Sequence, residues 1–435
     1  MKRRLSLLFA SLLLAGAAWA APAKSAKAPP PPQEIVLRHT LAGKPLDALA
    51  TLVVRFNEEE ARRAGGGGRL VLEDGKNQSD RMPLPHLALF DRDDALALFG
   101  TRPRFLPLHK VMAAGDQRFE AERFYPLVRE AVEDLAGRMQ ALPMGLSLPA
   151  LFFNKTAFEK ARLDPDNPPK TWWELQEAAG ALREAGYACP LTSSRFAWVH
   201  VENVASQHGE PIVTKQGKTE QLAVNNLVNV KHLALLTSWY KSRYFIWSGP
   251  GAEGDLRFAS GECAMLTGES SLYVRIAREQ PDFPLGVTVL PHYDDVYGAR
   301  PIQVLPDGAA LWVLAADKKP ERAIIARFIA FLLRPEIQRE WVRATGFLPM
   351  TPEAVAALRE TGGNPKLLDQ AERRLSMSAK EVRRTKSGFG KSRIRAILDE
   401  EIQFVWGEHK PPKAALDAAV ARAKPILTSL PAAAR

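Results

Sequence analysis

The order of strand-like and helical segments near the N-terminus restricts the fold more than any other feature of this chain. The segment "EIVLRHTLAG", residues 34–43, predicts a strand, and apolar residues at helical spacing follow in "PLDALATLVVRFNEEEARR". A second strand is predicted by "RLVLEDG". The segment "PHLALFDRDDALALFG" predicts a strand that runs into a helix at Asp91, where a carboxylate suits the helix N-terminus. This order is typical of an α/β fold with a largely parallel sheet.

The rest of the chain continues this pattern. In "PPKTWWELQEAAGALREAG", Thr171 and Glu174 form a capping box that predicts the start of a helix. In "ALWVLAADKKPERAIIARFIAFLLRPE" a strand, a turn and a helix follow one another, with Pro320 at the start of the helix and Pro335 at its end. The segments after it are mainly helical. A chain of 435 residues is too long for one ordinary core and suggests two domains.

Residues 1–20 have the pattern of a signal peptide. Three basic residues, Lys2, Arg3 and Arg4, precede an apolar stretch, and Ala18 and Ala20 place small residues where a signal peptidase cleaves. The apolar stretch is too short to span a membrane comfortably. Residues 21–32, rich in Ala and Pro, predict a disordered tether. We therefore expect an exported, soluble protein that resides in the periplasm.

The charge of the chain is positive, but its distribution argues against nucleic acid as a partner. The formal net charge is +10, and without the basic residues of the signal peptide it is +7. Such a balance favours anionic partners through long-range attraction. The Lys and Arg residues are scattered through predicted helices instead of gathering in one stretch. We expect a solvated basic surface and no nucleic-acid partner.

Two cysteines, Cys189 and Cys263, lie at the ends of apolar segments. In an oxidising compartment they can form a disulfide, and two buried free thiols are equally consistent with the sequence.

Motifs for catalysis and for metal binding are missing from the sequence. The histidines are spread along the chain, and neither a zinc-protease motif nor a nucleophile elbow nor a phosphate-binding loop occurs. His200 and Glu202 would lie on one face of a strand, a spacing that arises often by chance. We expect no enzyme, no metal and no cofactor. A binding protein needs aromatic surfaces in a cleft. Candidates are Trp198, Trp312, Trp341 and Phe347, although core packing is the favoured explanation for Trp312 and Trp341.

The segment "PMGLSLPALFFNKTAFEKARLDP", residues 143–165, followed by "PPKTWWEL", resembles the extracellular solute-binding proteins of ABC transporters. More narrowly, the chain resembles the periplasmic proteins that bind sn-glycerol 3-phosphate and its diesters. The resemblance extends from about residue 34 to the C-terminus through "WVHVEN", "VNVKHLALL", "SGECAM", "DGAALWV", "ATGFLPMT", "IRAILDEE" and "ALDAAVARA".

The resemblance implies the type II, maltose-binding-protein-like fold, in which two α/β lobes joined by a hinge close on a ligand in the cleft between them. It assigns residues 33–145 and 283–334 to the N-terminal lobe, and residues 148–281 and 335–425 to the C-terminal lobe. Residues 143–165 would then be a crossover between the lobes. The implied partners are a small-molecule ligand and inner-membrane ABC permease subunits, and the protein would be a monomer.

The resemblance also implies which residues contact a phosphate group. Ser147 corresponds to a serine that contacts phosphate, and Gly308 to a glycine whose backbone N–H faces it. Arg395, in "IRAILDEE", corresponds to the arginine that supplies the positive charge, for which a planar guanidinium is suited.

The glycerol part has its own implied contacts. Asp91 lies where relatives carry a glutamate that binds glycerol hydroxyls. Trp198 corresponds to one of two tryptophans that stack on the glycerol part, and Arg195 lies where the other would be.

Three departures from the family pattern affect this site. Phe347 replaces a tyrosine and so removes a hydroxyl donor. Glu269 lies where relatives have a serine, and the adjacent Ser270 could take over only with a shift of one residue. The segment between residues 73 and 91 is shorter than in relatives and lacks a helix and a ligand-facing tyrosine. A carboxylate beside a phosphate is unfavourable, so Glu269 would pair with Arg395, turn away, or meet a cationic group of the ligand.

These observations lead to one expected function and two alternatives. We expect a periplasmic substrate-binding protein of an ABC importer, which captures glycerol 3-phosphate, a glycerophosphodiester or a related polyol or phosphate compound. The first alternative is a sensor or adaptor with the same fold, altered specificity and no role in transport. The second is a periplasmic hydrolase of glycerophosphodiesters.

Overall fold

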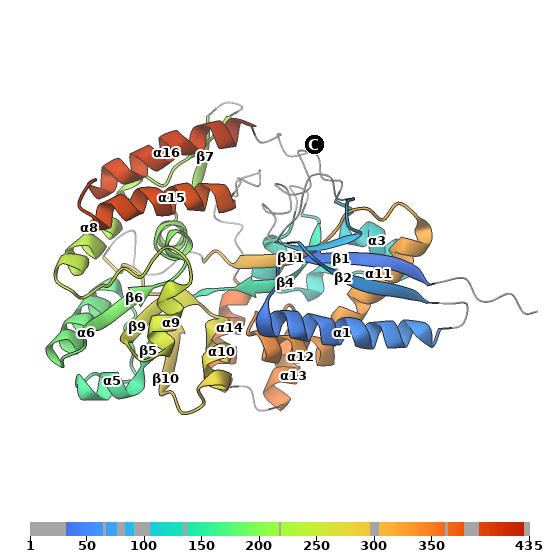
Figure 1. Ribbon diagram of the computed structural model, residues 1–435, viewed down its shortest axis with the longest axis horizontal. Helices are drawn as coiled ribbons and strands as arrows, with labels where there is room; N and C mark the ends of the chain where they lie inside the picture. Colours follow the sequence, from blue (N-terminus) through green and yellow to red (C-terminus); the bar gives the residue numbers. More distant parts are fainter. Residues whose placement is uncertain are drawn as a thin grey trace, which may run out of the picture.

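Two β-sheets with helices packed against them organise the molecule, side by side along its longest axis (Figure 1). The structure is a computed structural model. It describes residues 32–63, 67–75, 83–90, 105–133, 137–216, 219–295, 304–361, 364–377 and 391–429. The helix expected at Asp91 lies outside these residues.

The first sheet has the strand order β2-β1-β3-β11-β4. Its strands are β1 (Gln33–His39), β2 (Gly68–Asp74), β3 (Leu87–Phe90), β4 (Ala141–Ser147) and β11 (Asp307–Val313). Strand β1 runs parallel to β2 and β3, as the sequence predicted, whereas β11 is antiparallel to β3 and β4. The sheet is therefore mixed, because a strand from a distant part of the chain inserts between two N-terminal ones.

The helices of the first sheet come from both halves of the chain. They are α1 (Gly43–Ala61), α3 (Leu108–Ala114), α4 (Pro126–Glu130), α11 (Lys319–Leu332), α12 (Pro335–Thr345), α13 (Pro352–Glu360) and α14 (Pro365–Leu375), with a 3-10 turn, η1, at Ala121–Arg123. Their buried faces join the strands in one apolar core, to which Leu37, Phe56, Leu311 and Phe328 contribute. We call this sheet and its helices the first lobe.

The second sheet has the strand order β10-β5-β9-β6. Its strands are β5 (Pro149–Asn154), β6 (Cys189–Ser193), β9 (Cys263–Glu269) and β10 (Leu285–Val289), and β7 (Val213–Gln216) and β8 (Thr219–Leu222) form a separate hairpin. The surrounding helices are α5 (Lys155–Lys160), α6 (Trp172–Glu184), α7 (Val204–Gln207), α8 (Leu227–Lys241), α9 (Glu253–Ala259), α10 (Leu272–Glu279), α15 (Lys391–Trp406) and α16 (Pro412–Ser429), with a π-helix, η2, at Ala197–Asn203. We call this group the second lobe.

Local signals in the sequence explain where several of these helices begin. The capping box is present: Thr171 accepts a hydrogen bond from the backbone N–H of Glu174, whose side chain accepts one from the backbone of Thr171. Strand β5 ends at Asn154, whose side chain accepts a hydrogen bond from the N–H of Ala157 and so caps α5.

The chain passes between the lobes after β4, after β10 and after α14, so neither lobe is a continuous stretch. Two expected lobe boundaries are wrong in detail. Strand β10 pairs with β5, which places it in the second lobe although residue 283 was the expected return to the first. Helices α12 and α13 pack in the first core through Ile337, Trp341 and Val355, because their apolar faces match that core.

Cys189 and Cys263 form a disulfide, which settles the alternative left open by the sequence. The two residues are register partners on the parallel strands β6 and β9, so the bond links neighbouring strands of the second lobe.

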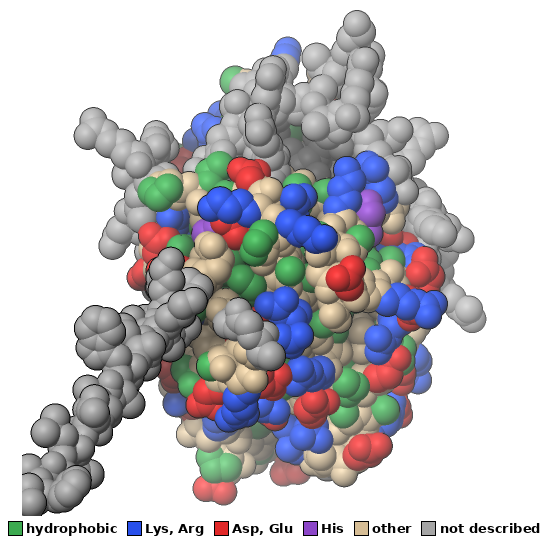
Figure 2. Space-filling view, turned by 90° about the vertical axis from the view of Figure 1, so that its right-hand side faces the viewer, with side chains coloured by type: hydrophobic (Ala, Val, Ile, Leu, Met, Phe, Trp, Pro, Cys, Tyr) green, Lys and Arg blue, Asp and Glu red, His purple; other side chains and the backbone are tan. Residues whose placement is uncertain are grey.

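Basic and acidic side chains are interspersed on the end of the first lobe that Figure 2 shows. Ion pairs such as Arg334 with Glu59 and Arg55 with Glu340 join helices on the surface of this lobe. In the part of the chain that the structure describes, no helix is long and apolar enough to cross a membrane.

Candidate ligand-binding site

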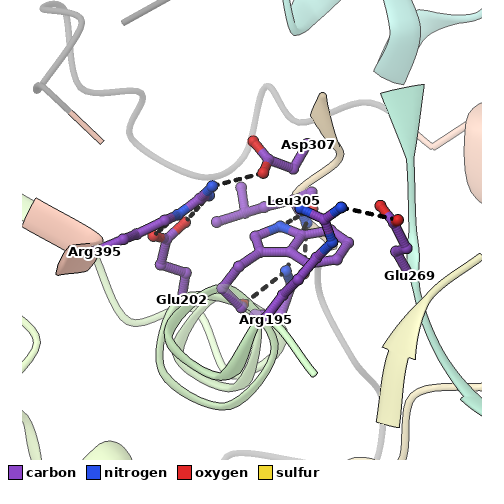
Figure 3. Close-up of polar contacts among 8 residues, drawn as sticks. Arg195, Glu202, Glu269, Leu305, Asp307 and Arg395 are labelled. Atoms are coloured by element: carbon purple, nitrogen blue, oxygen red, sulfur yellow. Dashed lines mark hydrogen bonds and ion pairs between the residues drawn. The ribbon is translucent and has the colours of Figure 1, made fainter. Parts of the chain in front are cut away.

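Arg395 lies where the lobes meet, and carboxylates of both lobes bind it (Figure 3). Its Nε and Nη2 donate to the two carboxylate oxygens of Glu202, at 2.6 and 2.7 Å. Its Nη1 donates to Oδ2 of Asp307 at 2.5 Å. Glu202 belongs to η2 of the second lobe, and Asp307 is the first residue of β11 in the first lobe. The guanidinium expected to face a phosphate therefore contacts two carboxylates.

The π-helix η2 determines where Glu202 points. The expectation that residues 200–203 form a strand is wrong: Ala197–Asn203 are helical and all seven residues are buried. His200 faces the core of the second lobe, where its ring bonds to Ser193, Thr267 and His232. Both sides of this helix are buried, so polar and apolar residues alternate along it as they do in a strand. Single π-turns occur frequently at functional sites.

Trp198 and Asn203 fix the segment that enters β11. Nε1 of Trp198 donates to the carbonyl oxygen of Leu305 at 3.0 Å. The side-chain amide of Asn203 donates to the same oxygen at 3.3 Å and accepts from the N–H of Leu305 at 2.8 Å. Trp198 is only 2% exposed. Its side chain thus joins the two lobes in addition to lining their junction.

A second ion pair, between Arg195 and Glu269, lies on the other side of Leu305 (Figure 3). Nη2 of Arg195 donates to Oε1 of Glu269 at 2.9 Å, and the two side chains are 44% and 20% exposed. Pairing with Arg395 was one of three alternatives that the sequence left for Glu269, and its partner is instead Arg195. Arg195 has φ of 51°, a left-handed conformation that costs about 1 kcal/mol for a non-glycine residue and is typical of functional segments.

The predicted phosphate contacts from β4 and β11 are adjacent. Ser147 and Asp307 are register partners at the ends of these strands, and Gly308 follows directly. Gly308 has φ of 132°, and a Cβ there would lie 1.9 Å from the carbonyl oxygen of Gly145, so only glycine fits. Ser147 is 1% exposed, and among the described residues its hydroxyl has no hydrogen-bond partner.

The remaining residues predicted for the site form no hydrogen bond or ion pair with Arg395 or Arg195 in the described part of the chain. The hydroxyl of Ser270 accepts a hydrogen bond from the N–H of Leu148 in the crossover. Phe347 packs against the first core beside Trp341, with the ring centroids 6.1 Å apart. Trp312 and Trp341 are core residues whose indole N–H groups donate to Phe90 and Met144. Asp91 and part of the shortened segment before it lie outside the described residues.

Burial and nearby carboxylates control the protonation of the site. Glu202 and Asp307 hold the pKa of Arg395 above its usual range, although burial acts in the opposite direction. Burial raises the pKa of Asp399, one turn further along α15, to about 7. Burial also raises the pKa of Asp255. Asp255 forms an ion pair with Arg275, at 3.3 Å.

The histidines belong to the core of the second lobe. His200 bonds to His232, which in turn bonds to the hydroxyl of Tyr293. Burial lowers the pKa of His200 to about 3 and that of His232 well below its ordinary value, so both are neutral. Within the described ranges, no group of three or more His, Cys, Asp or Glu residues is arranged to hold a metal ion.

Sequence reasoning missed Asp307 and assigned no ligand role to Glu202. The only available signal for Asp307 was its position directly before Gly308 in "LPDGAALWV". Nothing local indicates that it meets Arg395, because that contact joins residues from different lobes.

Comparison with known proteins gives consistent results. Residues 78–366 match the family model of the bacterial extracellular solute-binding protein. The sn-glycerol-3-phosphate-binding periplasmic protein UgpB of Salmonella paratyphi A is 34% identical over 329 residues, covering 74% of this chain and 75% of that protein. The protein of the same name from Yersinia pestis is 34% identical over 331 residues, covering 74% of each.

Solved structures with low sequence identity share the fold. The cyclic alpha-maltosyl-1,6-maltose binding protein of Arthrobacter globiformis has a TM-score of 0.69 at 18% identity, over 91% of this chain and 99% of that one. UgpB of Mycobacterium tuberculosis, in complex with glycerophosphocholine, has a TM-score of 0.69 at 18% identity, over 92% and 98%. The two-lobed, maltose-binding-protein-like fold expected from the sequence is thereby confirmed.

Proposed function

The chain belongs to the bacterial extracellular solute-binding proteins, and we propose that it captures a small polar solute between its lobes and delivers it to the inner-membrane permease of an ABC importer. The proposed solute is glycerol 3-phosphate, a glycerophosphodiester or a related polyol or phosphate compound. The names of the relatives support this class: two are called sn-glycerol-3-phosphate-binding, and a structural relative was solved with glycerophosphocholine.

The observation that carries the proposal is the meeting of two arginines and a tryptophan at the junction of the lobes. Arg395 and Trp198 come from the second lobe, and both contact the segment of the first lobe that contains Leu305 and Asp307. Guanidinium groups recognise oxygen-rich solutes through several directed N–H donors. A solute held at this junction would contact both lobes and would therefore favour their closure.

Binding accounts for these side chains better than catalysis does. Each arginine is engaged by a carboxylate, and the two neutral histidines are enclosed in the core of the second lobe. The relatives are solute-binding proteins, which agrees with a role in capture.

We propose that the protein acts in the periplasm as a monomer. The pattern of residues 1–20 and the periplasmic relatives support this location. One copy of the chain supplies both lobes and all the side chains described at their junction, so the site needs no second subunit.

A thermal-shift panel tests the proposed function. A ligand at 100 times its dissociation constant stabilises the folded state by about 2.7 kcal/mol, which raises the melting temperature by several degrees. The panel contains glycerol 3-phosphate, glycerophosphocholine, inorganic phosphate, maltose and a polyamine. We expect a shift with at least one phosphate or polyol compound and none with the polyamine.

The matched variants are Arg395→Gln, in the site, and Arg183→Gln, at an exposed position on α6. The first is expected to lose the ligand-dependent shift and the second to keep it. If only the polyamine stabilises the protein, or if no compound does, the proposed ligand class is wrong.

A transport assay separates an importer subunit from the sensor or adaptor alternative. Cells that express the permease encoded beside this protein should accumulate the radiolabelled ligand only when this protein is present. Binding without any effect on uptake would favour the sensor or adaptor.

A further inference from the structure

Every nitrogen of the Arg395 guanidinium already has a carboxylate partner. Glu202 binds Nε and Nη2 along one edge of the group, and Asp307 binds Nη1. These contacts use three of the five N–H donors of the group, so an anionic ligand meets an arginine whose charge two carboxylates already neutralise. The two carboxylates differ in how easily they can be replaced.

Glu202 is the fixed partner. It is 2% exposed, lies in η2 and belongs to the same lobe as Arg395. Its bidentate contact does not change when the lobes move relative to each other. Removing a ligand-binding arginine from this carboxylate would leave a buried charge unpaired, which is strongly unfavourable.

Asp307 is the partner that a ligand can replace. It is 15% exposed and reaches Arg395 from the opposite lobe. Its backbone position is set by pairing with Ser147 and by the close approach of Gly308 to Gly145. Because this segment has little freedom, the carboxylate stays directed at Arg395 when the lobes are together.

The charges at the junction disfavour a doubly charged anion. Arg395 with its two carboxylates carries a net charge of −1, and the pair of Arg195 with Glu269 is neutral. Asp307 also acts on Arg195, since it helps to raise the pKa of that guanidinium. A phosphate monoester bound at Arg395 would therefore add about two negative charges beside Glu202 and Asp307.

We propose that Asp307 is a specificity-determining residue: its carboxylate occupies Nη1 of Arg395, excludes phosphate monoesters and selects solutes that bring no net negative charge. This inference rests on the proposed function and narrows its ligand class. A zwitterionic diester or an uncharged polyol satisfies the requirement, because its hydroxyls can donate to Asp307 and accept from Arg395 without adding charge.

The test compares two variants of Asp307 with a control. Asp307→Asn keeps the shape and removes the charge, whereas Asp307→Ala also vacates Nη1. Asp282→Asn makes the same change in net charge at an exposed position before β10. Dissociation constants for inorganic phosphate, glycerol 3-phosphate and glycerophosphocholine are measured by calorimetry at pH 7.5, and circular dichroism confirms that each variant is folded.

We expect the wild type to bind glycerophosphocholine at least tenfold more tightly than glycerol 3-phosphate. Both Asp307 variants should gain at least tenfold in affinity for glycerol 3-phosphate and for phosphate, and Asp282→Asn should gain nothing. If only Asp307→Ala gains affinity for glycerol 3-phosphate and phosphate, the proposal is still supported, and the contact of the side chain with Nη1 is the cause of the weak binding. A gain in the variants when the wild type binds none of the probes also supports it.

Two results overturn the proposal. If the wild type binds glycerol 3-phosphate at least as tightly as glycerophosphocholine and the variants gain nothing, Asp307 does not select the ligand, while the proposed function remains valid. If neither the wild type nor any variant binds a compound of this set or of the thermal-shift panel, both the inference and the proposed function fail.

Discussion

The two lobes differ in what holds them together and in what they bring to the site. The first lobe has a large apolar core, and near Arg395 it offers one carboxylate and backbone groups around Gly308. The second lobe contains a disulfide and a buried chain of polar side chains, and it supplies Arg195, Trp198 and Arg395. Both lobes contain ion pairs with a buried carboxylate, such as Arg327 with Glu60 in the first, but the arginines at the junction come from the second lobe.

Removing the disulfide should change the stability more than any other variant proposed here. Cys189 and Cys263 are 74 residues apart, and a crosslink that closes a loop of this length stabilises a protein by about 4 kcal/mol in the chain-entropy model. We expect the double variant Cys189→Ala/Cys263→Ala to lose about that much free energy of unfolding in urea. Hydrogen exchange should show faster opening in β6 and β9 than in β1 and β11. Equally faster hydrogen exchange in both lobes would show that the disulfide does not stabilise the second lobe in particular.

Replacing Arg395 should have the next largest effect. Arg395→Met leaves Glu202 buried without its cation, which is expected to cost about 3 kcal/mol of stability. Arg195→Met is the matched variant, because this arginine is 44% exposed and its pair with Glu269 contributes less than about 1 kcal/mol. The measurement is chemical unfolding of both variants without ligand. Similar losses would mean that the two ion pairs are equivalent.

Protonation of His200 in acid should weaken the second lobe. Burial lowers the pKa of His200 to about 3 in the folded state, whereas in the unfolded state it is about 6.5. The contribution of His200 to the free energy of unfolding is therefore fully present above about pH 6.5, and it is lost as the pH falls because the unfolded state then binds a proton that the folded state does not. At pH 5 the loss is about 2 kcal/mol. Asp399 acts in the opposite sense. Because its pKa is raised to about 7, its contribution to the free energy of unfolding declines as the pH rises from about 4 to 7.

The variant His200→Asn isolates the histidine, because asparagine does not titrate. Its free energy of unfolding, measured in urea between pH 4.5 and 7.5, should depend less on pH than that of the wild type. An unchanged pH profile would show that His200 does not cause the acid sensitivity.

The smallest effect is expected for Trp198→Phe. The change removes the N–H that donates to the carbonyl oxygen of Leu305, and a single neutral hydrogen bond contributes about 1 kcal/mol. Because Asn203 still binds the same oxygen, the melting temperature should fall by only a few degrees. A much larger fall would indicate that Trp198 is the main connection between the lobes.

Sequence patterns predicted those parts of the fold that depend on neighbouring residues. The cap at Thr171 and the α/β order follow from local spacing, and the structure contains them. The resemblance to a family supplied the two-lobed arrangement. The chain order alone did not indicate that β11 inserts antiparallel between β3 and β4, because that pairing joins distant residues.

The resemblance placed some of the predicted site residues at the junction of the lobes, but it did not predict their contacts. Arg395 and Trp198 do lie at the junction of the lobes. The partners of Arg395 are 193 and 88 residues away in sequence, and no local pattern records such distances. The π-helix was missed because burial on opposite sides conceals its periodicity. Whether the predicted residues bind the ligand stays a prediction.

The repeated passage of the chain between the lobes has a consequence for dissecting the protein. Each lobe is assembled from separate stretches of the chain. Dividing the chain at any single position therefore leaves neither part with a complete set of both lobes' strands and helices. A functional half cannot be made by shortening the chain from either end. Joining distant stretches with new linkers, as in a designed rearrangement of the gene, is the only way to make one half by itself.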